Sequence, residues 1–327
     1  MSNVILEVKD LQISFDIDKK TAYAVNNLNF MIKKGQTLGI VGESGSGKSL
    51  SALAIMGLIP FPPGKIEGGE ILFKGMDLVK LEAKAMQKIR GKDISMIFQE
   101  PMTALNPVFT IGQQICETLM LHEKMNKKEA SERAVELLSE VGIAEASSRI
   151  HNYPFQMSGG MRQRSMIAIA LASNPSILIA DEPTTALDVS VQAQIFQLLK
   201  NIQRAKDTAI IFITHDMGSI ASMADRVIVM YAGRCVEAGT TAEILLTPQH
   251  PYTKGLIACI PHLNKKGGKI KERLNEIPGI VPSLLERGKG CSFAPRCSLA
   301  QDICFEHIPE TKIFGNERRI ACWQAKV

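Results

Sequence analysis

The eight residues GESGSGKS at positions 42–49 restrict the fold of this chain more than any other segment. They match the pattern G-x-x-x-x-G-K-[ST] at every defined position. An apolar run, QTLGIV at 36–41, precedes them, and helix-forming residues follow at 50–58. A phosphate-binding loop requires this context of a strand, a glycine-rich turn and a helix, so a chance glycine turn is a poor alternative. The segment therefore predicts an α/β protein that binds a nucleotide.

The residue types in this loop follow from the chemistry of phosphate. Glycines let consecutive backbone N–H groups point at phosphate oxygens, and the helix that begins near Lys48 adds its positive end. We expect the Lys48 ammonium to reach the β- and γ-phosphates and the Ser49 hydroxyl to ligate Mg²⁺. The loop residues expected to contact the nucleotide are Gly42, Ser44, Gly45, Ser46, Gly47, Lys48, Ser49 and Leu50.

Two carboxylates follow an apolar run much later in the chain. The residues SILIA at 176–180 predict a buried strand, which ends in Asp181 and Glu182. Adjacent acids at a buried strand end repel each other strongly unless a cation lies nearby. We expect Asp181 to hold Mg²⁺, through water, and Glu182 to polarise the water that attacks the γ-phosphate. Many strands end in Asp, so the two acids alone would be a weak signal. Together with the phosphate loop, they indicate a nucleoside triphosphatase.

The rest of the sequence fits a globular α/β protein. Apolar runs at 95–98 and 209–213 predict further buried strands of a parallel sheet, and residues 112–142 predict a helical lobe inserted between strands. No apolar run reaches the roughly 18 residues of a membrane span. The first ten residues are strand-like and lack the pattern of a signal peptide. We therefore expect a cytoplasmic protein, whose seven cysteines are not a disulfide framework.

The run MSGGMRQR at 157–164 resembles the signature of ABC (ATP-binding cassette) proteins. The resemblance implies a P-loop NTPase of the ABC type, with a RecA-like α/β core sheet and a helical signature subdomain at about 105–165. In that family the signature binds the γ-phosphate held by a second cassette, which implies this role for Ser158, Gly159 and Gly160. Met157 stands where the commonest signature has Leu. Met161 stands where it has Gln, which removes a polar contact.

Shorter matches occur in the order that the family shows. Gln99 follows the strand at 95–98 and resembles the Q-loop residue, which implies contact with Mg²⁺ and with a permease. Residues 186–188 (ALD) match the D-loop at the seam of the cassette dimer and assign Asp188 to it. His215 follows the strand at 209–213 and matches the switch histidine. A lone His after a strand is more often structural, but its order and distance from Glu182 favour the catalytic role.

The resemblance also requires an aromatic side chain that stacks on adenine. Phe15 and Tyr23 both qualify, with Phe15 slightly favoured, and either is also acceptable as a core residue. The residues that the resemblance implies for catalysis are Lys48, Gln99, Glu182 and His215. Those implied for Mg²⁺ are Ser49, Gln99 and Asp181.

ABC cassettes also drive DNA repair and translation, and the sequence weighs against both. Repair ATPases carry a long coiled coil between the phosphate loop and the signature, whereas this segment is short and has no heptads; translation factors usually carry two cassettes. The net charge of +5 is mild and forms no basic stripe, so no nucleic-acid partner is expected. The expected partners are a second ATPase subunit, two transmembrane permease subunits and, indirectly, an extracytoplasmic solute-binding protein. For the second ATPase subunit a homologous sibling is favoured, and a second copy of this chain stays open. The expected location is the cytoplasmic face of the cell membrane.

Three stretches resemble the oligopeptide/dipeptide importer subfamily: GIVGESGSG at 39–47, FQEPMTALNP at 98–107 and HPYT at 250–253. The last introduces a C-terminal extension in that subfamily, which implies an ATP-binding domain at 1–255 and an extension at 256–327. The implied function is ATP hydrolysis that energises import of di- or oligopeptides through a membrane permease. Relatives in the subfamily also move nickel, glutathione or sugars, so the cargo remains open. A non-transport ABC ATPase that acts on a macromolecule is the alternative from another class.

Four cysteines lie in the extension: Cys291, Cys297, Cys304 and Cys322. Their spacing is not the C-x₂-C pairing of zinc ribbons. Four cysteines in a short, proline-bounded segment suit a [4Fe–4S] cluster, and the segment resembles the cysteine-rich tail of dipeptide-importer ATPases, where such a cluster is expected. Structural Zn²⁺ ranks second, and unligated thiols third. Because a small appendage has little core, a metal site there would contribute folding energy and have a structural role.

Overall fold

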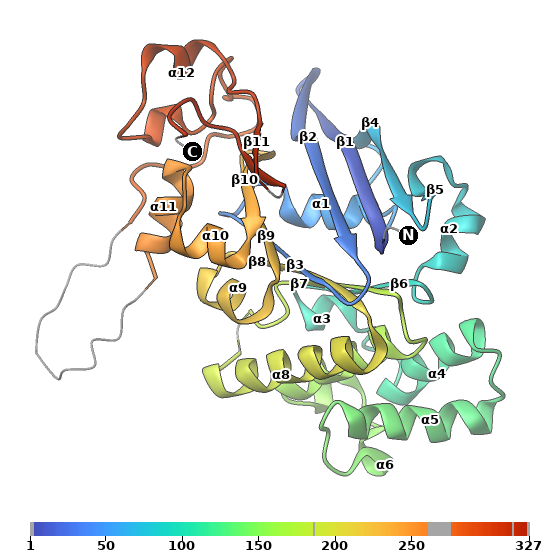
Figure 1. The fold of residues 1–327 in the computed structure, drawn as a ribbon. Coiled ribbons are helices and arrows are strands. Elements are labelled where there is room, and N and C mark those ends of the chain that lie inside the picture. Colours follow the sequence, from blue (N-terminus) through green and yellow to red (C-terminus); the bar gives the residue numbers. More distant parts are fainter. Residues whose placement is uncertain (1–2, 186, 261–275, 316, 326–327) are drawn as a thin grey trace, which may run out of the picture.

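The computed structural model of this 327-residue chain describes residues 3–185, 187–260, 276–315 and 317–325. Within these residues the strands form a sheet of eight and a sheet of four. Figure 1 shows helices α4, α5 and α6 at one end of the molecule and the C-terminal elements at the opposite end. The α/β class expected from the sequence is confirmed.

The centre of the main sheet is parallel and completely buried. Its order is β11-β12-β10-β9-β3-β8-β7-β6, and the last five strands of this order run parallel. Alternate residues of each central strand belong to two different apolar clusters, one on each face, which explains the unbroken Ile, Leu and Val content. The buried strands predicted from the sequence are confirmed. They are β3 (Thr37–Val41), β6 (Ile94–Ile97), β7 (Ile177–Asp181) and β8 (Ala209–Thr214), with β9 (Arg226–Tyr231) beside β3.

The second sheet is antiparallel, with the order β2-β1-β4-β5. Its apolar residues share one cluster with one face of the main sheet and with the helix that follows the phosphate loop. Only its first strand was predicted from the sequence. The elements on this side are β1 (Val4–Ile17), β2 (Lys20–Lys33), α1 (Lys48–Ile55), β4 (Gly64–Phe73), β5 (Met76–Asp77), the 3₁₀ turn η1 (Leu78–Lys80) and α2 (Ala83–Ile89).

The predicted helical lobe is present between β6 and β7. Two capping boxes explain where two of its helices begin: Thr110 pairs with Gln113, and Asn126 pairs with Glu129. The facing sides of these two helices bury Leu119 and other apolar residues completely. The elements are α3 (Pro101–Ala104), α4 (Ile111–His122), α5 (Lys127–Glu140), α6 (Ala146–Arg149), η2 (Pro154–Gln156) and α7 (Gly159–Leu171).

The C-terminal extension joins the main sheet instead of standing apart from it. Strand β12 pairs antiparallel with β10, and the partly buried Arg318 guanidinium lies 2.8 Å from the fully buried Glu237 carboxylate across that pairing. The remaining elements are α8 (Val189–Lys206), α9 (Met217–Met223), β10 (Arg234–Thr240), α10 (Thr241–Leu246), α11 (Pro251–Ala258), η3 (Ala294–Arg296), α12 (Asp302–Glu306), β11 (Lys312–Phe314) and β12 (Arg318–Ile320).

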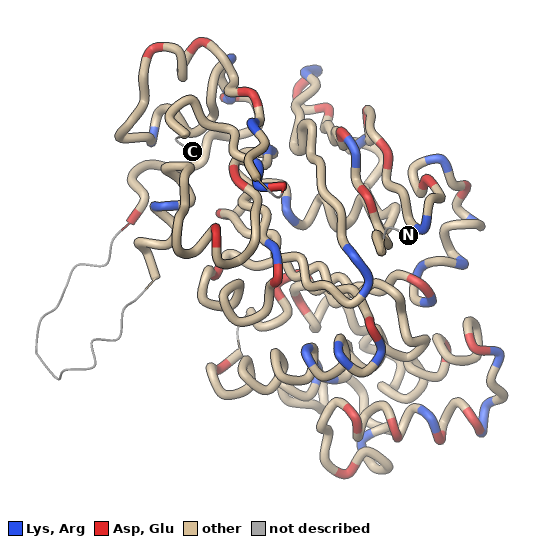
Figure 2. The backbone as a smooth tube through the Cα atoms, in the orientation of Figure 1, with Lys and Arg blue, Asp and Glu red and all other residues tan. Residues whose placement is uncertain are grey.

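Charged residues avoid the central strands and mix on the outside. Figure 2 shows positive and negative residues interspersed along the outer helices, while the strands at the centre carry few of either sign. This distribution is the one expected when the parallel sheet is covered on both faces. Among the helices of the described residues, none combines the length and the apolar content that a membrane span needs.

Candidate active site

The phosphate loop connects the end of β3 to the start of α1, as predicted. Two of its glycines are required by the local geometry. A Cβ at Gly42 would lie 2.2 Å from the Met230 carbonyl oxygen, and Gly47 has a φ of 96°, a left-handed conformation that side chains rarely adopt. The loop therefore fits closely against the end of β9, and its curve is set by the surrounding strands.

Lys48 is almost completely buried, with 5% of its surface exposed. Its ammonium donates hydrogen bonds to the Gly42 carbonyl at 2.7 Å and to the Glu43 carbonyl at 3.0 Å. Burial lowers the pKa of Lys48, and the nearby Glu182, Asp181 and Glu43 oppose that shift. A buried cation surrounded by carbonyls and carboxylates is well placed to receive phosphate oxygens.

The loop forms one side of a pocket of about 300 Å³. The buried Ser46 hydroxyl has no hydrogen-bond partner among the described residues, which is unusual for a buried polar group. An orphaned hydroxyl and a buried ammonium in one loop fit the phosphates of a nucleotide. The pocket is lined by Ala24, Ser44, Gly45, Gly47, Lys48, Ser49, Leu50, Gln99, Glu182 and Leu284.

Asp181 lies at the end of β7, directly beside the loop. The Ser49 hydroxyl donates to its carboxylate at 3.1 Å. Burial raises the pKa of Asp181, and Glu182 raises it further, while the Ser49 hydrogen bond and Lys48 oppose the shift. A bound cation would remove this penalty. The Ser49 hydroxyl and the Asp181 carboxylate are thus a suitable pair of oxygen donors for Mg²⁺.

Glu182 brings together two of the predicted catalytic side chains. One carboxylate oxygen accepts a hydrogen bond from the Gln99 amide at 3.3 Å, and the other lies 3.1 Å from Nδ1 of His215. The Thr185 hydroxyl also donates to Glu182 at 3.0 Å, a contact that the sequence analysis missed. Its place in the same turn, three residues after Glu182, was the available signal. Glu182 has a φ of 45°, so its backbone is held in a strained conformation at the edge of the pocket.

The signature residues lie outside this pocket. Ser158 caps α7, where its hydroxyl accepts a hydrogen bond from the Met161 N–H at 3.3 Å. A Cβ at Gly159 would meet nothing within 4 Å, and one at Gly160 would touch only Val191. These residues are therefore open on the side where a ligand would approach the helix end.

The D-loop aspartate is also exposed. Asp188 caps α8 and accepts hydrogen bonds from the Val191 N–H at 2.9 Å and from the Ser190 hydroxyl. The Ser190 hydrogen bond is the main cause that lowers the pKa of Asp188. Ala186, the first residue of the predicted D-loop, lies outside the described residues.

Neither aromatic candidate for adenine stacking lines the pocket. Phe15 is half-buried in β1, and its ring faces Gly64, where a Cβ would lie 2.8 Å from the ring edge. Tyr23 is 40% exposed in β2, and the next residue, Ala24, does line the pocket. The choice between the two stays a prediction.

The C-terminal extension reaches the phosphate loop, which the sequence analysis did not foresee. Leu284 lines the nucleotide pocket, and the Arg287 guanidinium donates to the Tyr23 carbonyl at 2.6 Å. The Arg296 guanidinium donates to both carboxylate oxygens of Glu43, at 2.7 and 3.0 Å. An arginine between two cysteines of the extension, and the HPYT run, were the only sequence features that pointed to these contacts.

The four cysteines of the extension lie near one another. The Cys291 N–H donates to the Cys304 carbonyl at 2.8 Å. Burial is the main cause that raises the pKa of the Cys291, Cys297 and Cys322 thiols, and neighbouring thiols of the set raise it further. Among the described residues, however, no three His, Cys, Asp or Glu side chains are grouped as a metal ion would require.

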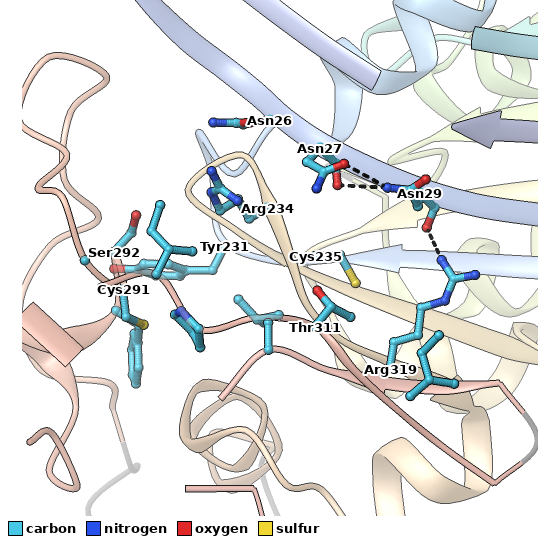
Figure 3. A pocket seen from close by; sticks show the side chains of 17 residues that line it. Asn26, Asn27, Asn29, Tyr231, Arg234, Cys235, Cys291, Ser292, Thr311 and Arg319 are labelled. Atoms are coloured by element: carbon cyan, nitrogen blue, oxygen red, sulfur yellow. Dashed lines mark hydrogen bonds between the residues drawn. The ribbon is translucent and has the colours of Figure 1, made fainter. Parts of the chain in front are cut away.

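A second pocket, of about 320 Å³, marks the joint between the extension and the rest of the chain. Figure 3 shows Tyr231 beside Cys291 and Ser292, with Arg234 and Arg319 from β10 and β12 on other sides of the pocket. Asn29 anchors this joint, because its carbonyl accepts a hydrogen bond from Arg319 at 3.1 Å. The extension is therefore attached through polar contacts to β2 as well as through the main sheet.

Family models and known proteins resemble this chain over most of its length. A family model described as "ABC transporter" matches residues 25–185, and one described as "Oligopeptide/dipeptide transporter, C-terminal region" matches residues 236–304. The oligopeptide transport ATP-binding protein OppD of Bacillus subtilis (strain 168) is 54% identical over 319 residues, which are 98% of this chain and 88% of the relative. The dipeptide transport ATP-binding protein DppD of the same organism is 49% identical over 98% of this chain and 94% of its own length.

Solved structures resemble the larger part of the chain. The post-hydrolysis state of the ATP-binding cassette MJ0796, bound to ADP and phosphate, has a TM-score of 0.66 at 30% identity and covers 72% of this chain and 98% of its own. The structure of cbiO1 from Clostridium perfringens, part of the transporter complex cbiONQ, has a TM-score of 0.63 at 27% identity and covers 75% of this chain and 92% of its own.

Proposed function

This chain belongs to the ABC transporter family, among the ATP-binding proteins of oligopeptide and dipeptide transport, and from that membership we propose that it hydrolyses ATP to drive import of di- and oligopeptides through a membrane permease. The cargo follows from the names of the relatives and from the C-terminal match. The lining of the nucleotide pocket suits phosphates and does not suit a peptide. We therefore infer that partner proteins decide which solute is carried.

One observation carries the ATPase part of the proposal. Lys48, Ser49 and Glu182 line the same pocket, and Glu182 is in contact with Gln99 and His215 there. A buried cation, a hydroxyl beside a buried carboxylate, and a second carboxylate at the pocket edge are the groups that hydrolysis of a phosphoanhydride needs.

The side chains divide the work of hydrolysis by their positions. Lys48 neutralises charge on the β- and γ-phosphates, helped by the backbone N–H groups of the loop. Ser49, Asp181 and Gln99 would hold Mg²⁺, which would supply positive charge against the charge that develops on the phosphates. Glu182 accepts a proton from the attacking water. His215, in contact with Glu182, holds the carboxylate in position relative to the γ-phosphate.

A second cassette is required by the open signature. Ser158, Gly159 and Gly160 lie at the exposed start of α7 and outside the chain's own pocket. We propose that they bind the γ-phosphate held by a partner cassette, a homologous sibling, and that Asp188 lies at the seam between the two. A solved dimer of the cassette MJ0796 is among the similar structures and supports this arrangement. Two permease subunits and a solute-binding protein complete the proposed importer, which places this chain at the cytoplasmic face of the membrane.

The cysteine set remains a candidate metal site. We propose that Cys291, Cys297, Cys304 and Cys322 hold a [4Fe–4S] cluster, with Zn²⁺ as the alternative, because the extension brings these buried and partly buried cysteines near one another. The structure does not group them as a metal ion would require, so binding would need a rearrangement of the loops. Iron, zinc and sulfide analysis of the anaerobically purified chain tests this. Iron with sulfide supports the cluster, zinc alone supports the alternative, and none of these overturns both.

Uptake in cells tests the transport role. Cells carrying the wild-type chain or Glu182→Gln are offered a mixture of di- to hexapeptides, with nickel and glutathione as control solutes. We expect peptide uptake alone to fail in the variant, because it binds ATP but does not turn it over. Failure of a control solute with normal peptide uptake would retain the importer and replace its cargo. Normal uptake of every solute would contradict the transport role.

A further inference from the structure

Glu43, the second residue of the phosphate loop, is held from outside the loop by Arg296 of the extension. The contact is bidentate: one guanidinium nitrogen lies 2.7 Å from Oε2 and the other lies 3.0 Å from Oε1. The Arg296 side chain is only 4% exposed. Paired hydrogen bonds between charged groups in fixed geometry are among the strongest and most directional side-chain contacts. The position of Glu43 therefore depends on a residue more than 250 positions later in the chain.

Arg296 is itself fixed on every side. Its remaining donors reach the Pro278 carbonyl at 2.8 Å and the Ile277 carbonyl at 3.2 Å, and one also reaches the Tyr231 hydroxyl at 3.3 Å. Its guanidinium carbon lies 5.7 Å from the centre of the Tyr231 ring. The hydrogen bonds to Glu43 are the main cause that raises the pKa of Arg296. A guanidinium with this many partners acts as a rigid support.

Tyr252 of the HPYT run holds the backbone of the same residue. Its hydroxyl accepts a hydrogen bond from the Glu43 N–H at 2.8 Å. The Tyr252 ring is fully buried, and its centre lies 4.7 Å from that of Tyr231 and 5.4 Å from that of Phe293. His250 of the same run caps α11 by accepting from the Tyr252 N–H at 3.1 Å, and burial lowers its pKa to about 3, so it stays neutral. The HPYT run thus holds the Tyr252 hydroxyl in a fixed position against the Glu43 N–H.

Glu43 in turn contacts the residues that bind phosphate. Its carbonyl accepts hydrogen bonds from the Lys48 ammonium at 3.0 Å and from the Ser46 N–H at 3.2 Å. A shift of Glu43 would therefore move a backbone acceptor shared by the loop's cation and by one of its amides. A loop that is already held in its binding conformation loses less conformational freedom on binding, which raises its affinity for the ligand.

We propose that Arg296 and Tyr252 are positioning residues for the phosphate loop, through which the C-terminal extension sets the affinity of the chain for ATP. Neither residue touches the nucleotide pocket directly. The proposal rests on ATP binding by the loop and is independent of which solute the transporter carries.

Equilibrium binding of a fluorescent ATP analogue, with Mg²⁺, to the full-length chain tests this. We expect Arg296→Met to raise Kd about tenfold, because the loop loses its preorganisation and Glu43 is left without its partner. Arg296→Lys should recover only part of the affinity, since an ammonium cannot form the bidentate contact. Glu43→Gln should weaken binding in the same direction, and the double variant should bind no worse than Arg296→Met alone, since both changes break one contact.

Arg318→Met is the matched control. Arg318 forms the other buried ion pair of the extension, 2.8 Å from Glu237, and has no contact with the loop among the described residues. We expect it to lower the melting temperature while Kd for ATP stays within about twofold, the ordinary effect of a change far from the site. Equal Kd for wild type and Arg296→Met, with only a lower melting temperature, would reduce the pair to a structural attachment. If Arg296→Met does not fold, Tyr252→Phe removes one hydrogen bond at constant ring packing, and an unchanged Kd there overturns the proposal.

Discussion

The phosphate loop and the signature are both glycine-containing segments at the start of a helix, but the chain surrounds them differently. The loop's Lys48 and its neighbour Asp181 are 5% and 4% exposed, and a Cβ at Gly42 would collide with the backbone of β9. In the signature, by contrast, a Cβ at Gly159 would meet no atom within 4 Å, and Ser158 is exposed. The first segment is enclosed by its own chain, whereas the second faces outward.

This difference separates two uses of the same local geometry. A helix N-terminus attracts anions wherever it occurs. In the loop, buried side chains and neighbouring strands complete the site, so one chain can bind the nucleotide. In the signature only the helix end and its capping serine are supplied, and the rest of the site must come from the ligand and from the second chain that holds it. Substitutions in the loop should therefore weaken ATP binding by the isolated chain. Substitutions in the signature should leave that binding unchanged and lower only the activity of the assembled ATPase.

The largest effect is expected at the pocket edge, from Glu182→Gln. If Glu182 is the base, as proposed, its loss should lower phosphate release by the assembled transporter about 100-fold or more, while the isolated chain still binds ATP. Phosphate release and binding of an ATP analogue measure the two properties. Glu100→Gln changes an exposed acid next to Gln99 and should leave both unchanged. Unaltered phosphate release in Glu182→Gln would remove Glu182 from catalysis.

The next largest difference is expected between a glycine-to-alanine change in the phosphate loop and one in the signature. Gly42→Ala places a Cβ 2.2 Å from the Met230 oxygen and 2.8 Å from the Ser46 hydroxyl, so we expect a loss of about 1–3 kcal/mol in the free energy of unfolding and much weaker ATP binding. Gly159→Ala meets open space at the start of α7 and should leave stability within about 0.5 kcal/mol or raise it slightly.

In the assembled ATPase, unlike in the isolated chain, Gly159→Ala should also be harmful. A phosphate that approaches the helix end closely would meet the new methyl group, so activity should fall although the isolated chain folds and binds ATP normally. Thermal unfolding, ATP binding and ATPase activity are compared for both variants. Full activity with Gly159→Ala would mean that the signature is not approached closely by a ligand.

Removal of the signature's capping hydroxyl gives a smaller effect on stability. Ser158→Ala should cost about 1 kcal/mol of unfolding free energy, because the Met161 N–H loses its acceptor. Thr110→Ala removes a cap of the same kind at α4, away from both segments, and should cost a similar amount. Only Ser158→Ala should also reduce ATPase activity in the assembled transporter. Equal activity in the two variants would assign Ser158 a capping role alone.

The pH dependence of ATP binding by the isolated chain should be the smallest effect. Burial lowers the pKa of Lys48, so its positive charge is lost at lower pH than in an exposed lysine as the pH rises. Burial raises the pKa of Asp181, so its negative charge is lost at higher pH than in an exposed aspartate as the pH falls. Affinity for Mg-ATP should therefore decline towards both limits. Titrations at several pH values, with thermal unfolding as the control for folding, measure this decline. A flat profile throughout the range in which the chain stays folded would place the charge for binding elsewhere.

The sequence predicted the parts of the molecule that follow local rules. The loop pattern at 42–49, the apolar runs before Gln99 and Asp181, and the order of His215 after Glu182 all have a local signal, and the structure brings these residues into contact or into one pocket. The parallel sheet was predictable for the same reason, since strands buried on both faces are continuously apolar.

The contacts that the sequence did not reveal join distant segments. Nothing near Glu43 indicates that Arg296 pairs with it, because an ion pair leaves no periodicity and depends on how the extension folds back. The antiparallel sheet was missed beyond its first strand for a related reason. Its strands alternate between buried and partly exposed residues and contain bulges, for example between Val8 and Leu11, which interrupt the alternation that would have identified them.

The pairing of β12 with β10 has a consequence for how the protein is made. A ribosome synthesises the chain from its first residue onward. When residues 1–255 have emerged, β10 is an open edge strand, and the phosphate loop does not yet have Arg296 beside Glu43. Both are completed only by residues translated later, at 296 and at 318–320. A nascent chain that has emerged only to residue 255 would therefore expose a sheet edge, and under the proposal above its phosphate loop would reach full affinity for ATP only after residue 296 has followed.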